Sequence, residues 1–260
     1  MNEGLRLALS FLVGGIWVAA TTAVAERRGS RQGGFIGGMP STLAVALVFV
    51  AWTGGVEAAR TAAEVAPLAF AVNGLFVLVF AIGSRHGFHL GMGVALATWG
   101  VLQTAIVWAG GAPLGFSVAA WVVVFAVCWI LFRTVLALAP QPATGPAAGP
   151  LALVLRALAS GALVAAAVGI SQRGGAVAGG VLASAPVVFV SSLFIANRTM
   201  GLEFARAMGR SLLFSAVINC SVFALAFHVT VSRLPLLPAF ALAYAVTIVA
   251  AIPVYRLRLG

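Results

Sequence analysis

Long apolar runs recur along the whole chain, and short charged or Gly/Pro-rich segments separate them. A bilayer core of about 30 Å requires roughly 20 apolar residues in a helix, and about nine of the runs reach that length. The expected membrane-spanning helices lie at approximately 5–25, 33–54, 58–82, 88–109, 115–138, 151–171, 176–197, 202–230 and 235–256. Residues 139–146 are rich in Pro and cannot continue a helix, so we expect a linker there.

The composition supports membrane-spanning helices and opposes a soluble domain. Hydrophobic residues make up 62% of the chain and charged residues only 8%, whereas a soluble domain carries about 25% charged residues. So few charges cannot cover a surface that faces water. The pattern therefore predicts an all-α integral membrane protein whose main partner is the lipid bilayer.

The formal net charge of +10 comes from Arg, because the chain contains no Lys. A strongly basic chain invites a nucleic-acid partner. Here the Arg residues stand at the ends of apolar runs, where the retention of positive charge on the cytoplasmic side of a membrane explains them. We therefore expect no nucleic-acid partner.

An internal repeat is the most informative feature of the sequence. Shifted by 146 positions, as from Asn73 to Asn219, the chain aligns with itself without a gap from about residue 5 to about residue 78. Chance matches of Ala, Leu and Val are expected between membrane segments, but matches of rarer residues in one register are not. The matched pairs include Gly15/Gly161, Arg27/Arg173, Pro40/Pro186, Gly55/Gly201, Glu57/Glu203 and Arg60/Arg206.

Each repeat contains four expected spans, and the span at 115–138 has no counterpart. An odd extra crossing places the second repeat in the opposite orientation, which predicts a 4+1+4 arrangement of inverted repeats. The expected units are 1–112, the linker helix and Pro/Gly loop at 113–148, and 149–260. Inverted repeats are the architecture of many secondary transporters. Two fused repeats suit a pseudo-symmetric monomer, although the sequence does not fix the oligomeric state.

The distribution of Arg orients this arrangement. If the spans alternate, Arg6, Arg60, Arg173 and Arg233 fall on one side, and the other eleven of the fifteen Arg residues fall on the opposite side. The positive-inside rule then predicts a multi-pass protein of the bacterial inner membrane, with its N-terminus outside and its C-terminus in the cytoplasm.

A short motif recurs in both repeats after the second expected span. It reads Gly201-Leu202-Glu203-Phe204-Ala205-Arg206 in the second repeat and Gly55-Val56-Glu57-Ala58-Ala59-Arg60 in the first. With the Gly-rich start and the proline of the preceding span, and with Leu234-Pro235 before the last span, the second repeat resembles the GlpM-like family of small four-span bacterial inner-membrane proteins. The resemblance implies a multi-pass inner-membrane location. It brings no transported substrate with it, and single-repeat relatives would have to pair antiparallel to build what fusion builds here.

Three carboxylates and their basic neighbours are candidate binding residues for a solute or ion. Glu57 and Arg60, like Glu203 and Arg206, lie three residues apart on one helical face. Each pair either anchors a helix end as an interfacial salt bridge or lines a cavity and contacts a charged solute or a proton. Glu64 lies one turn deeper, and it either titrates a proton or pairs with Arg60.

Polar and helix-breaking residues inside the spans form a second group of candidates. Asn73 and Asn219 fall in mid-span, where each amide either bonds to a neighbouring helix or binds solute near a pseudo-twofold axis. Gly34, Pro40, Gly180 and Pro186 are candidate kink positions at the start of the second span of each repeat. Broken helices in matching positions of two halves point to a transporter site. The alternative is a tightly packed pair of kinked helices with no ligand.

Enzymatic function is not expected. The chain has no Asp or Lys and only three His, and it contains no hydrolase elbow, P-loop, dinucleotide fingerprint or HExxH motif. We therefore expect no catalytic residue, no cofactor and no metal site. The leading hypothesis is a secondary-transporter-like permease for a small solute or ion. The alternative is a non-transporting accessory or scaffold subunit of an envelope or polysaccharide machinery.

Overall fold

The computed structural model describes residues 2–27, 39–136, 138 and 149–256. Nearly all of these residues are helical, and no strand occurs among them. The helices are α1 (Glu3–Arg27), α3 (Ser41–Gly83), the 3-10 turn η1 (Ser84–His86), α4 (Phe88–Trp108), α5 (Leu114–Leu131), the π-helical turn η2 (Phe132–Leu136), α6 (Pro150–Gly174), α7 (Ala176–Ala183), α8 (Val187–Met200), α9 (Leu202–Leu212), the π-helical turn η3 (Leu213–Val217), α10 (Ile218–Thr230) and α11 (Leu236–Arg256).

The described part of the chain contains 8 helical segments long and apolar enough to cross a bilayer. The chain is therefore an all-α, polytopic membrane protein, in agreement with the hydropathy pattern. Among these segments, the broad limits expected from the sequence match α1, α4, α5 with η2, α6, the segment formed by α9, η3 and α10, and α11. Two segments differ from the expectation in an informative way, and both differences concern helix breaks.

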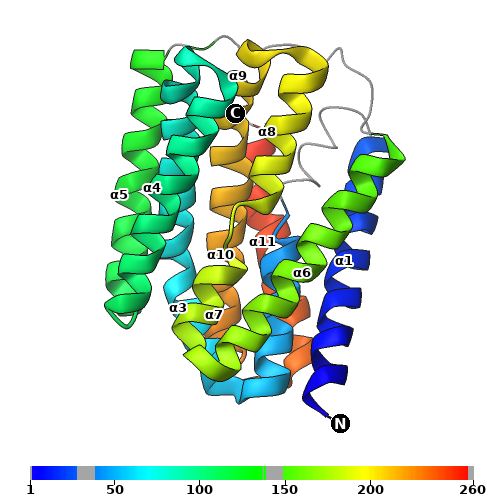
Figure 1. Ribbon diagram of the computed structural model, residues 1–260. Coiled ribbons are helices and arrows are strands. Elements are labelled where there is room, and N and C mark those ends of the chain that lie inside the picture. Colours follow the sequence, from blue (N-terminus) through cyan, green and yellow to red (C-terminus); the bar gives the residue numbers. More distant parts are fainter. Residues whose placement is uncertain (1, 28–38, 137, 139–148, 257–260) are drawn as a thin grey trace.

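The first difference is α3, which runs through the boundary expected between 33–54 and 58–82. With η1 it forms a helical segment of 46 residues, which would measure about 69 Å if straight and would exceed twice the bilayer core. It is not straight, because Gly55 has φ 86 and ψ 172, outside the helical region. Figure 1 shows the chain turning back there at the lower end of the molecule. The glycine makes this turn without a loop, since only glycine adopts a positive φ freely.

The second difference is the segment expected as one span at 176–197. It is divided into α7 and α8 by a non-helical stretch at 184–186. Figure 1 shows α7 rising from the lower end and α8 continuing to the upper end, with the break between them. The interior of the bundle therefore contains irregular backbone, which a membrane protein tolerates only where protein buries it or a cavity receives it.

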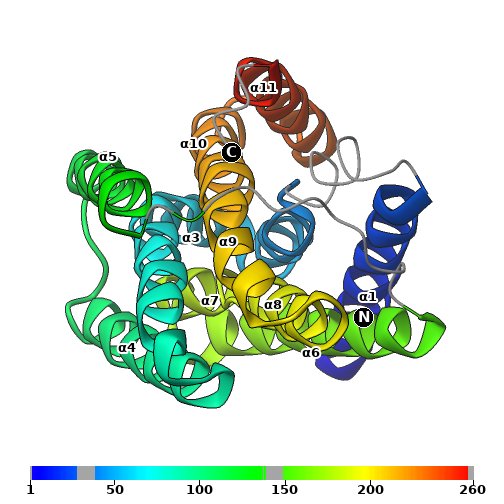
Figure 2. The ribbon, with the colours of Figure 1, turned by 90° about the horizontal axis from the view of Figure 1, so that it is seen from above.

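Helix α3 forms the centre of the bundle. In its most apolar window 78% of the residues are buried, whereas the value for the segment that includes α5 is only 11%. Figure 2 shows α4 and α5 on one side of the bundle and α1 and α11 on the other. Large apolar side chains on the outer helices, such as Val101, Val123 and Val249, are exposed, as expected of surfaces that face lipid tails.

Helices α1 and α6 cross at a contact between backbones. A Cβ atom on Gly15 would lie 2.9 Å from the carbonyl oxygen of Ala157, and one on Gly161 would lie 2.5 Å from that of Phe11. Only glycine fits at such distances, and small residues are the usual means of close helix packing in membranes. Figure 1 shows the two helices side by side and running in opposite directions.

Candidate functional site

Pro186 marks the break between α7 and α8. It stands at the N-cap of α8 with φ −80 and ψ 38, and it has no N–H to continue the hydrogen bonding of α7. Helix α7 has 8 residues and is about 12 Å long. A break about 12 Å along a segment long enough to span a bilayer core of about 30 Å falls short of the far end of that segment. Ser184 and Phe189, on either side of Pro186, are 1% and 3% exposed, so α8 starts in the interior of the protein.

Pro40 gives α3 the same kind of start. It is the N-cap of α3 with φ −75 and ψ 51. The backbone hydrogen bonds also correspond, because the amide after each proline donates to the carbonyl two residues earlier, at 2.7 Å in Ser41 and 2.8 Å in Val187. The carbonyl of each proline then accepts from the residue four positions on, at 2.9 Å for Pro40 and 2.8 Å for Pro186. The two helices begin with nearly identical backbone geometry.

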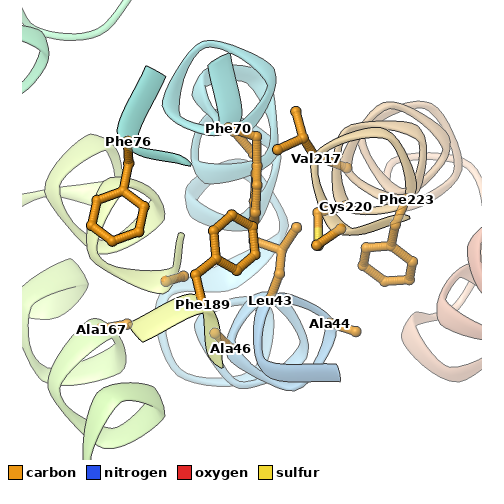
Figure 3. Packing of buried hydrophobic residues seen from close by; sticks show 14 of the residues in the cluster. Leu43, Ala44, Ala46, Phe70, Phe76, Ala167, Phe189, Val217, Cys220 and Phe223 are labelled. Atoms are coloured by element: carbon orange, nitrogen blue, oxygen red, sulfur yellow. The ribbon is translucent and has the colours of Figure 1, made fainter. Parts of the chain in front are cut away.

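These two helix N-termini open onto one cavity of about 40 Å³. It is lined by residues 39–43 at the start of α3, by residues 183–185, 188 and 189 at the break, and by Phe70, Asn73, Ala216 and Cys220. Figure 3 shows Leu43, Phe70 and Phe189 gathered between the helices in this region. The volume exceeds the roughly 10–15 Å³ that one water molecule requires. The cavity is thus large enough for a small ion or for a few water molecules.

Asn73 fastens the break to the centre of the bundle. Its side chain is 1% exposed, and its Nδ2 donates to the carbonyl oxygen of Ser184 at 2.7 Å. The indole Nε1 of Trp99 donates to Asn73 Oδ1 at 2.8 Å. Both ends of the amide are therefore used in bonds between helices, and Asn73 also lines the cavity. Asn219, the residue that the sequence alignment pairs with Asn73, is buried as well, at 3% exposed.

The two Glu-x-x-Arg pairs lie away from the cavity, and none of their residues lines it. Arg60 and Glu57 are 4.0 Å apart, with side chains 46% and 82% exposed. Arg206 approaches Glu203 to 2.7 Å, is buried, and donates from Nε to the carbonyl oxygen of Ala81 at 3.1 Å. That carbonyl is among the last of α3, where a cation interacts favourably with the helix dipole. Arg206 therefore anchors α9 to the end of α3.

Glu64 has a partner that the sequence did not indicate. Its Oε1 accepts a hydrogen bond of 2.8 Å from the amide of Leu114, the first residue of α5. A carboxylate at a helix N-terminus satisfies a free N–H and complements the helix dipole. The salt bridge to Arg60 considered from the sequence does not occur among the ion pairs of the described residues. Glu64 also borders an open surface pocket of about 390 Å³.

Gly180, one of the two glycine kink candidates, does not form the break. Gly34 lies outside the described residues. Gly180 lies within α7, four residues before Ser184. A Cβ atom on Gly180 would lie 2.7 Å from the carbonyl oxygen of Ala62, so the glycine allows α7 to approach α3. The sequence pattern could not separate these roles, because a kink and a close contact both favour glycine.

No group of three or more His, Cys, Asp or Glu side chains suited to a metal occurs in the part of the chain that the structure describes. Comparison with known proteins gives no further guide, because no protein-family model, curated protein or solved structure matches the chain. The geometry of the site therefore carries the functional argument alone.

Proposed function

We propose that this chain is a secondary-transporter-like permease of the bacterial inner membrane that carries a small solute or ion. The observation that carries the proposal is the pair of helix N-termini that start inside the membrane and share one cavity. Discontinuous helices in corresponding positions of two halves, with a binding site between them, are typical of secondary transporters.

The proposal includes two inverted four-span repeats joined by one linker helix. Two pairs of matching backbone angles and one pair of reciprocal contacts support it. Gly55 and Gly201, which are 146 positions apart, have φ/ψ values of 86/172 and 87/171. Pro40 and Pro186, at the same separation, cap α3 and α8 with nearly equal angles. The reciprocal backbone contacts of α1 and α6 also relate positions 146 apart, because Gly15 meets Ala157 and Gly161 meets Phe11. Antiparallel helices packed about a twofold axis produce such reciprocity.

In this proposal the chain crosses the membrane nine times, since the turn at Gly55 divides α3 between two crossings. The proposed orientation keeps the N-terminus outside and the C-terminus in the cytoplasm, as the Arg distribution favours. The kinship with the GlpM-like family is part of the same proposal, because an antiparallel pair of four-span chains would have the symmetry that is fused here.

Transport requires the cavity to open to each side in turn. The inverted repeats supply two equivalent arrangements of the same contacts, so rocking one repeat against the other exposes the cavity to opposite faces. Asn73 holds the break against α3 in the present arrangement. The Glu203–Arg206 pair joins α9 to α3 at one end of the bundle, and Glu57–Arg60 is its repeat counterpart. These pairs are the proposed contacts that change during rocking.

A non-transporting accessory or scaffold role is the second candidate, and the tight interior favours it. The cavity measures only about 40 Å³, and large side chains such as Phe76, Phe80 and Phe223 are fully buried. A scaffold needs a packed interior and no route for a solute.

Flux measurements separate the two candidates. The purified protein is reconstituted into liposomes and tested with labelled inorganic anions, cations and small neutral solutes. We expect uptake of at least one class by the wild type, and loss of that uptake in Glu57→Gln and in Glu203→Gln. Glu3→Gln is the matched control, because Glu3 forms an exposed salt bridge of 2.7 Å with Arg173 outside the motif.

Size-exclusion profiles must show that all variants remain folded and inserted. Normal flux in both motif variants would remove the Glu-x-x-Arg pairs from the mechanism. Absence of flux for every solute class with an intact wild-type protein would favour the scaffold.

A further inference from the structure

Backbone donors at the two helix starts are unused. The amide N–H groups of Leu43, Val188 and Phe189 have no acceptor among the described residues. The first N–H groups of a helix cannot bond within the helix, and the carbonyl of Ser184 that would stand one turn before Val188 accepts from Asn73 instead. All three residues line the cavity. Burying an N–H group away from water without an acceptor costs free energy. We therefore expect an acceptor in the space in front of these N–H groups.

Two hydroxyl groups add to these donors. Ser41 is only 9% exposed, lines the cavity, and forms no side-chain hydrogen bond with any described residue. The Oγ1 atom of Thr42, which also lines the cavity, is buried and has no partner there either. A buried hydroxyl is normally satisfied. Among the described residues, the buried, unsatisfied Thr42 hydroxyl and the neighbouring Ser41 hydroxyl, beside unused N–H groups, indicate that the cavity receives a hydrogen-bond acceptor.

The charge of the cavity narrows the kind of acceptor. A helix N-terminus carries roughly +0.5 of an elementary charge, so the starts of α3 and α8 together supply about one positive charge. Among the residues that the structure describes, no carboxylate and no cationic side chain lines the cavity. In the low dielectric of a membrane interior this field acts strongly on an ion. It favours one negative charge and disfavours cations.

We infer that the cavity binds a small monovalent anion of about halide size between the N-termini of α3 and α8. The N–H groups of Leu43, Val188 and Phe189 and the hydroxyls of Ser41 and Thr42 donate to it. The volume of about 40 Å³ suits a halide or nitrate. The apolar walls formed by Leu43, Phe70 and Phe189 offer no full hydration shell, so weakly hydrated anions bind better than sulfate or phosphate. Transport of this anion rests on the proposed function. Binding of the anion does not, because binding requires no movement of the helices.

Binding is tested on the intact purified protein in detergent, with chloride, bromide, nitrate and sulfate titrated calorimetrically into a gluconate buffer at constant ionic strength. We expect saturable binding of one monovalent anion per chain and no binding of sulfate. The double variant Ser41→Ala/Thr42→Val keeps the size of the side chains and removes two donors, so its Kd should rise about tenfold or more.

Ser160→Ala is the matched control. Ser160 is 0% exposed and its hydroxyl has no partner, but it lies in α6 outside the cavity lining, so the Kd should stay unchanged. Ala216→Leu is a second test variant, which fills the cavity without removing a donor and should abolish binding. It keeps the inference testable if the double variant fails to fold.

Unchanged affinity in either cavity variant, or no saturable binding of any monovalent anion by the wild type, would overturn the inference. The liposome flux experiment separates this failure from failure of the permease proposal. Flux of a cation or neutral solute without anion binding would refute the anion site and leave the permease. Anion binding without any flux would refute the permease and leave the site.

Discussion

Substitution of Gly161 by Ala tests the crossing of α1 and α6, which supports the proposed inverted arrangement. The added Cβ would lie 2.5 Å from the carbonyl oxygen of Phe11, whereas ordinary contacts begin at 3.4 Å. The helices would therefore have to separate locally by about 3.4 − 2.5 = 0.9 Å. The neighbouring atom is backbone, so no side-chain rotation relieves the contact.

Overpacking of this kind costs about 1–3 kcal/mol, and a gain in helix propensity of up to about 1 kcal/mol from Gly to Ala offsets part of it. Gly93 in α4 is the control, because a Cβ there would meet no atom within 4 Å. Gly93→Ala should keep the propensity gain without the clash. The two variants should thus differ in stability by about 1–3 kcal/mol. Gly15→Ala should fall between them, since its Cβ would be 2.9 Å from the carbonyl of Ala157.

Thermal unfolding in detergent, followed by size-exclusion chromatography of heated samples, measures this order. For a chain of this size 1 kcal/mol corresponds to a shift in Tm of about 2–4 °C. A Gly161→Ala protein as stable as Gly93→Ala would refute the close backbone contact and the reciprocity drawn from it.

Three further substitutions test the site and the turns. Asn73→Leu removes two hydrogen bonds and should lower stability by about 1–3 kcal/mol and abolish liposome flux; an unchanged Tm would contradict the role given to the amide. Gly201→Ala should cost about 1–2 kcal/mol, since φ is 87 and a Cβ is strained there; a stabilised variant would show that the turn differs. Arg206→Gln should cost about 1–3 kcal/mol, because it removes the charged donor to the carbonyl oxygen of Ala81, whose other side-chain donor, Ser84 Oγ, is 3.5 Å away. The change Arg60→Gln, at the position that the sequence alignment pairs with Arg206, should alter stability by no more than about 0.5 kcal/mol, because the ion pair of Arg60 is exposed. Equal losses in the two Arg variants, by the same Tm assay, would refute the difference in burial.

The sequence alone determined the class of the protein and several of its local breaks. Apolar content and run length are sufficient to predict membrane-spanning helices. The thickness of the bilayer core fixes the length of a span, and the absence of water there requires each span to bond its own backbone polar groups. The prolines were also informative, because the missing N–H of a proline interrupts the hydrogen bonding of its own helix. The helix starts at Pro40 and Pro186 agree with that reasoning.

Contacts between distant parts of the chain could not be obtained in this way. Titration of a proton and pairing with Arg60 were the two alternatives for Glu64 from the sequence, yet its carboxylate caps α5 from 50 residues away. Gly180 was grouped with the kinks, although its role is contact with α3. Both outcomes depend on which helix lies opposite, and helical periodicity carries no information on that neighbour.

The cavity is the clearest case of a feature decided by tertiary structure. The sequence singled out Pro40, Pro186 and Asn73, but not Ser41 or Thr42, because a Ser-Thr pair at the start of a helix is common and usually serves as a cap. The donors of these residues become significant only because α8 begins opposite them, and because Asn73 takes the carbonyl at the break. Hydropathy and local sterics produce the two helix starts, but only the packing of α3 against α7, α8 and α10 brings them to one buried space.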